Sequence, residues 1–366
     1  MFTEGPTDEE LAFSDMTWIG DSYSYKHMVG HRASLAGELY EGCKKESAIR
    51  FHFASPITEF KSFSPKPTFI VSPRKNGGDP YTASCDVLFG ADGVKSRTRV
   101  AILQELGVDA KVVDSGQAAY RIMLKRQDME KDPELLALID ADQSTRWIGE
   151  RKHIIASPVS SKTIYNISTA HPDSNFAAAP DETYTTLGSK ESMLSVYSDF
   201  GPVIQKMLNM VPEGEVCEWK LRVHQPLPTW VHGTAALVGD ACHPTLPHLN
   251  QGAAQAIEDA AVIAAALSRT PDPGPEGINK ALKVYERLRK ERAEALVAMA
   301  AANGKEMQLG DGAAAAERDA AFKAFRESGQ GKVPDKAADK GVLSFIYEWD
   351  ASKETADQFD SIYKSL

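Results

Sequence analysis

The sequence lacks any apolar run close to the ~20 residues that a membrane-spanning helix needs. Its first residues, MFTEGPTDEELAF, lack the basic and apolar regions of a signal peptide. Cysteine is scarce: Cys43, Cys85, Cys217 and Cys242 are far apart and form no Cys-x-x-Cys pair, which is typical of a reduced protein. We therefore expect a cytoplasmic protein without stable membrane insertion.

Positive charge is also in deficit, with 41 Lys and Arg against 51 Asp and Glu, for a net charge of −10. Binding to a nucleic-acid backbone needs a basic face, so nucleic acid is not an expected partner. His27 and His31 are four residues apart, but Gly30 interrupts the helix that a shared metal would need, and no nearby carboxylate or cysteine completes a set. No metal is expected.

The most informative stretch runs from residue 234 to 267. Its apolar run, residues 235–238, is typical of a buried strand and stops at Gly239 and Asp240, so a carboxylate lies at the carboxyl end of the strand. A loop with two prolines follows, and an alanine-rich helix is predicted after Gln251 and Gly252. The carboxylate and the free N–H groups at the helix start can together bind a polar, electron-rich ligand.

Two further segments carry similar signals. Residues 85–93 predict an apolar strand that ends at Asp92 and Gly93, where glycine allows close approach of the backbone and the aspartate can organise neighbouring N–H groups. The segment VGHRASLAGEL predicts a helix that begins near Arg32. A guanidinium group suits phosphate oxygens because it donates several hydrogen bonds in one plane. Taken alone, a surface arginine without a ligand is an equally good interpretation.

These segments resemble the motifs of FAD-dependent aromatic hydroxylases, the salicylate hydroxylase-like group A flavoprotein monooxygenases. GDACHPTLPHLNQGAAQAIEDA is similar to their second flavin-binding motif, GADGVKSRTR to their Asp-Gly motif, and HRASL to a helix start that contacts FAD. The resemblance implies a monooxygenase that uses FAD, NAD(P)H and O₂. Such an enzyme hydroxylates a small aromatic, phenolic or salicylate-like acid substrate through a flavin C4a-hydroperoxide.

The resemblance also implies a cofactor site. In that family the aspartate at position 240 binds the ribityl chain, and the loop through Pro247 and the following helix start lie against the isoalloxazine. The implied cofactor-binding residues are Arg32, Asp92, Gly93, Gly239, Asp240, Pro247, Gln251 and Gly252.

Two residues of the middle third are candidate catalytic residues. His224 lies where a common version of the family has Arg in an Asp-Arg pair. A histidine near a phenol could take its proton or bind a carboxylate, because its pKa lies near neutrality. A histidine bonded to backbone at a strand end is the alternative. Arg121 could anchor an anionic substrate or form a structural pair.

The family begins with a β-α-β unit that carries Gly-x-Gly-x-x-Gly, and nothing before Arg32 matches it. We therefore expect an α/β fold: an N-terminally truncated, Rossmann-like FAD/NAD(P)-binding domain, interleaved with a mixed, largely antiparallel β-sheet substrate domain and followed by C-terminal helices. Two alternatives stay open. The chain could be an FAD-deficient, inactive remnant, or a flavin epoxidase that acts on a non-aromatic, terpenoid substrate.

The domains are predicted as follows. Residues 1–114 and 233–305 form the FAD-binding domain, residues 115–232 the substrate sheet, and residues 306–366 a flexible segment with a C-terminal tail. A long helix is predicted over residues 279–302, and its mixed charges from Glu286 to Arg292 are interpreted as a solvated face. Both a monomer and a homodimer are consistent with the sequence.

Overall fold

The computed structural model describes residues 1–23, 27–74, 78–109, 112–174, 185–329, 331 and 333–366. The chain folds into two compact units, each described here by itself. Unit 1 comprises Met1–Ser47, Asp114–Leu221 and Ala302–Ser344, and unit 2 comprises Ala48–Val113, Arg222–Ala301 and Phe345–Leu366. The first 47 residues group with the large sheet, and Phe345–Leu366 group with the segments that contain Asp92 and Asp240. Among the described helices, none combines the length and the apolar character needed to cross a bilayer.

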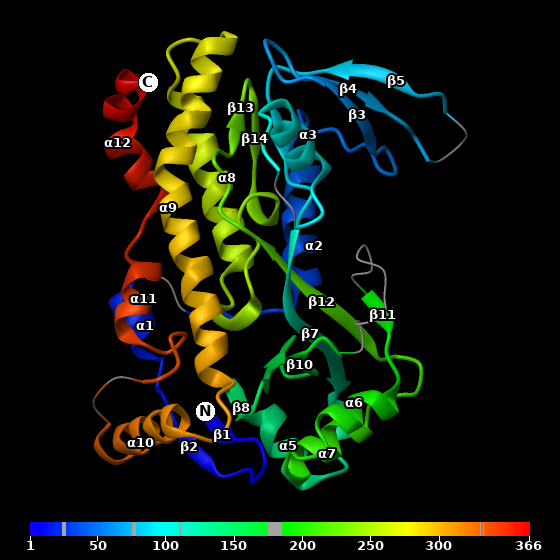
Figure 1. The fold of residues 1–366 in the computed structure, drawn as a ribbon, viewed down its shortest axis with the longest axis vertical. Coiled ribbons are helices and arrows are strands. Elements are labelled where there is room, and N and C mark those ends of the chain that lie inside the picture. Colours follow the sequence, from blue (N-terminus) through cyan, green and yellow to red (C-terminus); the bar gives the residue numbers. More distant parts are fainter. Residues whose placement is uncertain (24–26, 75–77, 110–111, 175–184, 330, 332) are drawn as a thin grey trace. The chain divides into compact units, whose positions relative to one another are not determined.

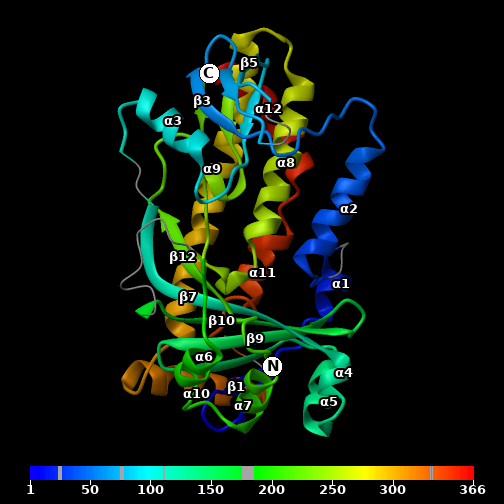
Figure 2. The same ribbon diagram turned by 90° about the vertical axis from the view of Figure 1, so that its right-hand side faces the viewer.

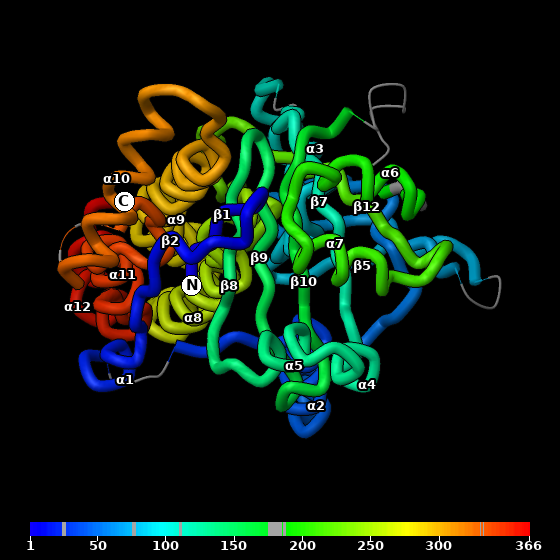
Figure 3. Tube along the Cα trace, turned by 90° about the horizontal axis from the view of Figure 1, so that it is seen from below, coloured from blue at the N-terminus to red at the C-terminus, as the bar shows by residue number. Residues whose placement is uncertain are grey.

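An eight-stranded sheet forms the centre of unit 1. Its strands follow the order β11-β12-β7-β10-β9-β8-β1-β2, which can be traced from β2 to β12 in Figure 3. Their bounds are β1 Phe2–Glu4, β2 Glu10–Ala12, β7 Val112–Lys125, β8 Thr145–Gly149, β9 Lys152–Val159, β10 Ile164–Pro172, β11 Thr185–Leu187 and β12 Cys217–His224. The pairs β7–β10, β10–β9, β9–β8, β1–β2 and β11–β12 are antiparallel and β1 runs parallel to β8, so the prediction of a mixed, largely antiparallel sheet is confirmed.

Short helices cover one face of this sheet, where α5, α6 and α7 gather (Figure 1). The helices that lie in unit 1 are α1 Trp18–Ser22, α2 Arg32–Lys44, α4 Arg126–Met129, α5 Pro133–Asp140, α6 Lys190–Val196, α7 Pro202–Asn209 and α10 Ala313–Ser328. Helix α7 begins at a proline, which suits a first turn, and buries Ile204 and Met207 with Tyr120 and Trp147 in one apolar core.

The segment predicted to be flexible contains helix α10. Its Phe322 is fully buried and lies with its ring centroid 5.0 Å from that of Phe2. Arg318 of the same helix is also buried. Composition misled the prediction here, because a few apolar side chains at helical spacing suffice to pack an alanine-rich helix.

Unit 2 contains two small sheets and the longest helices. One sheet has the order β13-β14-β6, and the other is the ribbon β3-β4-β5. The strand bounds are β3 Ile57–Ser62, β4 Thr68–Val71, β5 Tyr81–Ser84, β6 Leu88–Gly90, β13 Val231–His232 and β14 Ala235–Leu237. The helices are α3 Arg97–Glu105, α8 Gly252–Arg269 and α12 Ala351–Ser365; α9, Pro275–Met307, and α11, Lys340–Tyr347, each continue into unit 1. Both the alanine-rich stretch and the charged stretch form helices, as predicted, and α8 and α9 run side by side (Figures 1 and 2).

Candidate functional site

The two strands that precede Asp92 and Asp240, β6 and β14, are neighbours in one sheet. Strand β14 pairs with β6 in parallel, with Leu237 opposite Gly90, and the Val238 N–H donates to the Gly90 carbonyl at 3.0 Å. Because the strands are parallel and in register, the turns that follow them leave the same edge of the sheet. Asp92 and Asp240 therefore both follow strands at this one edge.

The first turn uses its acid to start a helix. One carboxylate oxygen of Asp92 accepts from the Ser96 hydroxyl at 2.5 Å, and the other accepts from the N–H groups of Arg97 at 2.8 Å and Thr98 at 3.1 Å. These donors are among the first N–H groups of α3, so Asp92 supports the start of that helix together with its N-cap residue, Ser96, which accepts from the Arg99 N–H at 2.8 Å. Gly93 has φ +76° with open space beside its Cα, so a left-handed turn explains the glycine.

Arg99 joins the two turns. Its side chain is 1% exposed, and it donates to the Ala241 carbonyl at 3.0 Å and to the Val94 carbonyl at 2.6 Å. One planar guanidinium group thus bonds the turn after Asp240 and the turn after Asp92. The arginine of the Asp-Gly motif is therefore a structural link between the two motifs.

The second turn leaves its acid at the surface. Residues Gly239–Ala241 form a 3-10 turn, Gly239 has φ +61°, and Asp240 is exposed. A Cβ on Gly239 would lie 3.2 Å from that of Ala256, so the glycine also allows the turn to approach α8 closely. Asp240 is therefore accessible to a ligand beside the start of that helix.

The loop then leads to the amino end of α8. A short 3-10 helix, Pro247–Leu249, is followed by Asn250 at φ +56°, and α8 begins at Gly252. The N-cap residue, Gln251, makes no side-chain capping hydrogen bond. The first N–H groups of this 18-residue helix lie at the end where the helix dipole is positive, which favours an acceptor atom.

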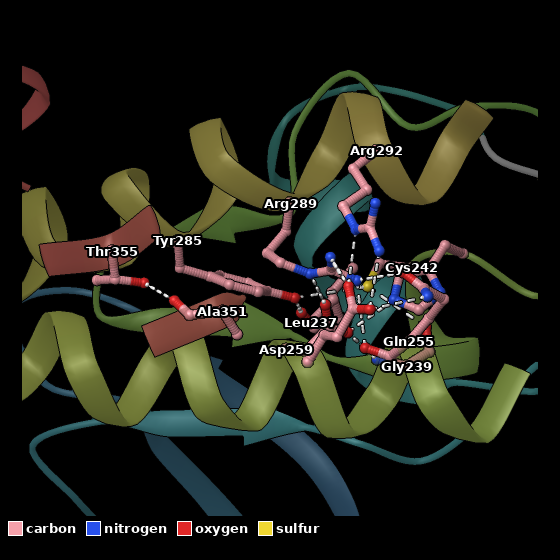
Figure 4. A network of polar contacts seen from close by, with 12 residues as sticks. Leu237, Gly239, Cys242, Gln255, Asp259, Tyr285, Arg289, Arg292, Ala351 and Thr355 are labelled. Carbon is pink, nitrogen blue, oxygen red and sulfur yellow. Dashed lines mark hydrogen bonds and ion pairs between the residues drawn. The ribbon is translucent and has the colours of Figure 1, made fainter. Parts of the chain in front are cut away.

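A buried carboxylate on α8 forms hydrogen bonds with the second turn (Figure 4). Asp259 of α8 is 0% exposed. Its Oδ2 accepts from the Gly239 N–H at 3.0 Å and from His243 Nε2 at 2.6 Å, and its Oδ1 accepts from Arg289 Nε at 2.9 Å. Burial acts to raise the pKa of Asp259, but the hydrogen bond and charge of His243, the charge of Arg289 and the Gly239 N–H outweigh it, so the pKa lies below its usual value.

Two charges of α9, Arg289 and Arg292, are also buried, which contradicts the predicted solvated face for these two; Arg287 and Glu291 of the same run are exposed. Arg289 is 0% exposed and donates to Glu258 and, at 2.6 Å, to the Gln255 side chain. Arg292 is 7% exposed and donates twice to Glu258, at 2.9 and 3.0 Å. Both guanidinium groups lie over the ring of Trp349, 5.0 and 4.6 Å from its centroid. The charge run was misinterpreted because its partners come from α8, far away in sequence.

One group of this network has the donor types of a metal site. The side-chain ligand atoms of Cys242, His243 and Asp259 lie within 4.8 Å of one another. Burial raises the pKa of the Cys242 thiol well above its usual value, whereas a metal binds the thiolate. Arg289 already provides a positive charge to Asp259. The group is better described as a hydrogen-bonded support for the turn.

His224, a predicted catalytic residue, lies at the end of β12 and lines a pocket of about 300 Å³ in unit 2. The other lining residues include Cys242, His243, Leu246 and Val297. His224 is 9% exposed and its Nδ1 lies 2.7 Å from the Gln225 carbonyl, which is the backbone contact of the alternative interpretation. Burial lowers the pKa of His224, so the neutral imidazole is favoured.

Arg121 and Arg32, the other predicted cations, both lie in unit 1. Arg121 is on β7, and its guanidinium group hydrogen-bonds to the hydroxyl of Ser168 on β10. Arg32 is the first residue of α2 and is exposed. Loss of hydration and the nearby charge of Arg32 lower the pKa of Arg121, so these two cations are close enough to interact. They belong to a different unit from Asp92, Asp240 and His224.

The residues of unit 2 fit an FAD molecule in part. An exposed carboxylate suits ribityl hydroxyls, and an uncapped helix start suits the electron-rich edge of the isoalloxazine. Asp92 fits a direct contact less well, since it already accepts hydrogen bonds from α3. The Gly239–Gly252 segment thus offers acceptor and donor groups of the kinds that a flavin would need.

Comparison with solved structures gives the fold class. A salicylate hydroxylase in complex with its substrate superimposes with a TM-score of 0.74 at 22% identity, covering 97% of this chain and 80% of that one. HpxO of Klebsiella pneumoniae, solved with FAD and uric acid, gives 0.72 at 22% identity, covering 94% and 79%. The fold is that of FAD-dependent hydroxylases.

Sequence comparison then gives the family. A model described as the FAD binding domain matches residues 8–300. The FAD-dependent monooxygenase atnJ of Arthrinium sp is 34% identical over 274 residues, which cover 75% of this chain and 62% of that protein. A 3-hydroxybenzoate 6-hydroxylase of Aquipseudomonas alcaligenes is 30% identical over 298 residues, covering 79% and 67%. The chain belongs to the family of FAD-dependent monooxygenases that includes the aromatic hydroxylases, and it spans about six tenths of the length of the curated relatives it matches first.

Proposed function

We propose that this protein is an FAD-dependent, NAD(P)H-using monooxygenase that hydroxylates a small aromatic substrate with a phenolic or carboxylate group. The observation that carries the proposal is the exposed Asp240 next to the uncapped start of α8, in a chain of this family. Relatives named for 3-hydroxybenzoate and salicylate support an aromatic acid as substrate. When bound, the flavin supplies the redox and oxygen chemistry, and the protein supplies binding, orientation and exclusion of water.

The cofactor is proposed to lie against the Gly239–Gly252 segment. The Asp240 carboxylate would accept hydrogen bonds from ribityl hydroxyls, and Pro247, Gln251 and Gly252 would line the ring. The N–H groups at the start of α8 would stabilise negative charge on the adjacent ring edge. Arg32 is proposed to bind phosphate or ribityl oxygens, and the turn at Asp92 and Gly93 to shape the neighbouring wall.

Two residues are proposed to act on the substrate. Neutral His224 can accept a proton from a phenol, and its lowered pKa keeps it in that form at neutral pH. Arg121 can pair with an anionic group, since a guanidinium group binds a carboxylate with two parallel hydrogen bonds.

A purified sample tests the proposal. The expected result is a yellow protein with flavin absorbance bands, or one that acquires them with added FAD, and NAD(P)H oxidation that salicylate-like acids stimulate. Hydroxylated product in near-equal amount to the NAD(P)H consumed would complete the assignment. A colourless protein that ignores added FAD would instead identify an FAD-deficient remnant. Stimulation by polyprenyl compounds, but not by aromatic acids, would identify an epoxidase.

A further inference from the structure

Asp259 touches the flavin-binding turn on both sides of Asp240. One hydrogen bond goes to the backbone N–H of Gly239, the residue before Asp240, and another goes to the imidazole of His243, three residues after it. Both bonds end on the same oxygen, Oδ2, at 3.0 and 2.6 Å. Figure 4 shows this carboxylate pointing from α8 to the turn.

We propose that Asp259 is a positioning residue for FAD: it fixes the Gly239–His243 turn and thereby aims the Asp240 carboxylate. The inference rests on the proposed role of Asp240 as a ribityl ligand. Asp259 itself is fully buried and bonded to the back of the turn, so it acts through the turn.

The backbone hydrogen bonds within the turn are local, and besides Asp259 the Arg99 guanidinium group bonds its Ala241 carbonyl. The N–H groups of Cys242 and His243 both donate to the Gly239 carbonyl, at 2.9 and 3.0 Å, which closes the turn on itself. Gly239 is held at φ +61°. This is only one of the many backbone conformations that a glycine can adopt in the unfolded chain. A bond from the Gly239 N–H to a carboxylate on α8 selects one of these alternatives and fixes the turn to a long helix.

The positively charged Arg289 favours the ionised form of the Asp259 carboxylate. Arg289 donates from Nε to Oδ1 of Asp259, opposite the oxygen that holds the turn. Three donors, from Gly239, His243 and Arg289, thus converge on two oxygens. Asparagine has the same shape but only one acceptor oxygen, and its amide N–H group would face at least one of these donors. Because Gly239 and His243 share Oδ2, the amide either turns its N–H group to both of them or accepts from both with an uncharged oxygen. The Asp259→Asn change should therefore weaken both ties to the turn.

The chain offers a matched control in the preceding residue. Glu258 is another largely buried carboxylate of α8, and its side chain accepts from Arg289, Arg292 and Gln255. These contacts join α8 to α9 and to its own helix. The Glu258→Gln change removes a buried ion pair of similar kind but leaves both hydrogen bonds to the turn. A merely structural role for Asp259 predicts the same behaviour for both variants.

The experiment measures two properties of the full chain: hydrogen exchange of the peptides that cover residues 236–250, and the affinity for added FAD by absorbance titration. We expect Asp259→Asn to speed exchange in these peptides and to weaken FAD binding by about tenfold, the equivalent of one charge-assisted hydrogen bond. Glu258→Gln should leave both properties near wild type while lowering the melting temperature to a similar degree. Equal effects of the two variants, or wild-type exchange in Asp259→Asn, would overturn the proposal.

Two further arms keep the outcome decisive. If Asp259→Asn does not fold, His243→Gln removes one of the two ties, and faster exchange confined to residues 236–250 is the expected result; unchanged exchange there would overturn the proposal. If the wild-type chain binds no FAD, the proposed function fails, while the exchange data still decide whether Asp259 holds the turn.

Discussion

The turns after β6 and β14 look alike in sequence and differ in structure. Each is an apolar strand followed by an aspartate and a glycine at positive φ, and the two strands are parallel neighbours. Asp92 accepts its hydrogen bonds from the following helix, α3. Asp240 is exposed, and a different acid, Asp259 of α8, bonds the backbone of its turn. In the first turn, Asp92 itself bonds the backbone. In the second turn, Asp259 bonds the backbone and Asp240 is the exposed acid.

This difference separates a structural carboxylate from a candidate ligand. A carboxylate with its oxygens bonded to N–H groups stabilises the backbone and has little capacity left for a cofactor. A carboxylate whose turn is fixed by another residue can face a ligand without loss of local structure. We therefore expect substitutions on the Asp240 side to divide into stability effects and cofactor effects, and substitutions on the Asp92 side to affect mainly stability.

The largest expected effect on stability comes from the buried ion network behind the Asp240 turn. Arg289→Met removes a fully buried guanidinium group and leaves Asp259 and Glu258 without their shared partner. Loss of one partner from a buried ion network costs about 3–5 kcal/mol of unfolding free energy. Urea denaturation followed by circular dichroism measures it. A loss below about 1 kcal/mol, as is typical of exposed ion pairs, would contradict the buried network.

The next effect separates the two exposed acids. Asp240→Ala should weaken FAD binding by roughly 10- to 100-fold, because hydrogen bonds to a charged group contribute about 1.5–3 kcal/mol. The unfolding free energy should change little, since the side chain is exposed. Titration with FAD and urea denaturation measure the two quantities on one sample. Loss of stability with unchanged FAD affinity would reverse the roles assigned to the two turns.

Asp92→Ala should show the opposite result: a clear loss of unfolding free energy and a smaller loss of FAD affinity. It removes the acceptor for the first N–H groups of α3, which costs about 1–2 kcal/mol of unfolding free energy for a helix cap. FAD affinity should fall less than in Asp240→Ala. Asp92→Asn is the matched control, because its amide oxygen still accepts from the helix and should recover part of the stability. An Asp92→Asn variant as unstable as Asp92→Ala would show that capping is not the role of this side chain.

The sequence predicted the two turns better than their support. Local signals suffice for a strand, an acid, a loop and a helix start, and the repeated pattern made it possible to predict that Asp92 and Asp240 leave one edge. The charge run of α9 was interpreted as solvated because Arg289 and Arg292 find their partners on α8, some 30 residues earlier. Pairing between distant segments is not encoded in local charge pattern.

A signal for the buried network was nevertheless present. Tyr285, Arg289 and Arg292 are spaced four and three residues apart, so they share a helix face with Leu296, while Gln255 and Asp259 share the buried face of α8 with Val262. Opposite charges on the apolar faces of two consecutive helices indicate a buried ion network. Which acid bonds the backbone of each turn and which acid stays exposed depends on hydrogen-bond geometry, so these roles could not be predicted from the sequence.

The smallest expected effect concerns pH and again lies on the Asp240 side. Burial lowers the pKa of His224, and the charges of Arg99, which bonds both turns, and of His243 lower it further, while the carbonyls of Gln225 and Ala241 act in the opposite direction. The unfolded chain, with an ordinary histidine pKa of about 6.5, then takes up a proton before the folded chain does. The fold should therefore lose stability as the pH falls below about 6.5, by at most about 1.4 kcal/mol per pH unit for this group, until the folded-state pKa is reached.

Melting temperatures of the wild type and of His224→Gln between pH 7.5 and 5 measure this contribution. The variant should be less sensitive to acid over this range, because glutamine does not titrate. His232→Gln is the control, since His232 lies at the surface of the same unit beside Glu105. If the acid sensitivity of His224→Gln equals that of the wild type, protonation of His224 does not couple to folding, and its contact with the Gln225 carbonyl would have to hold in both protonation states.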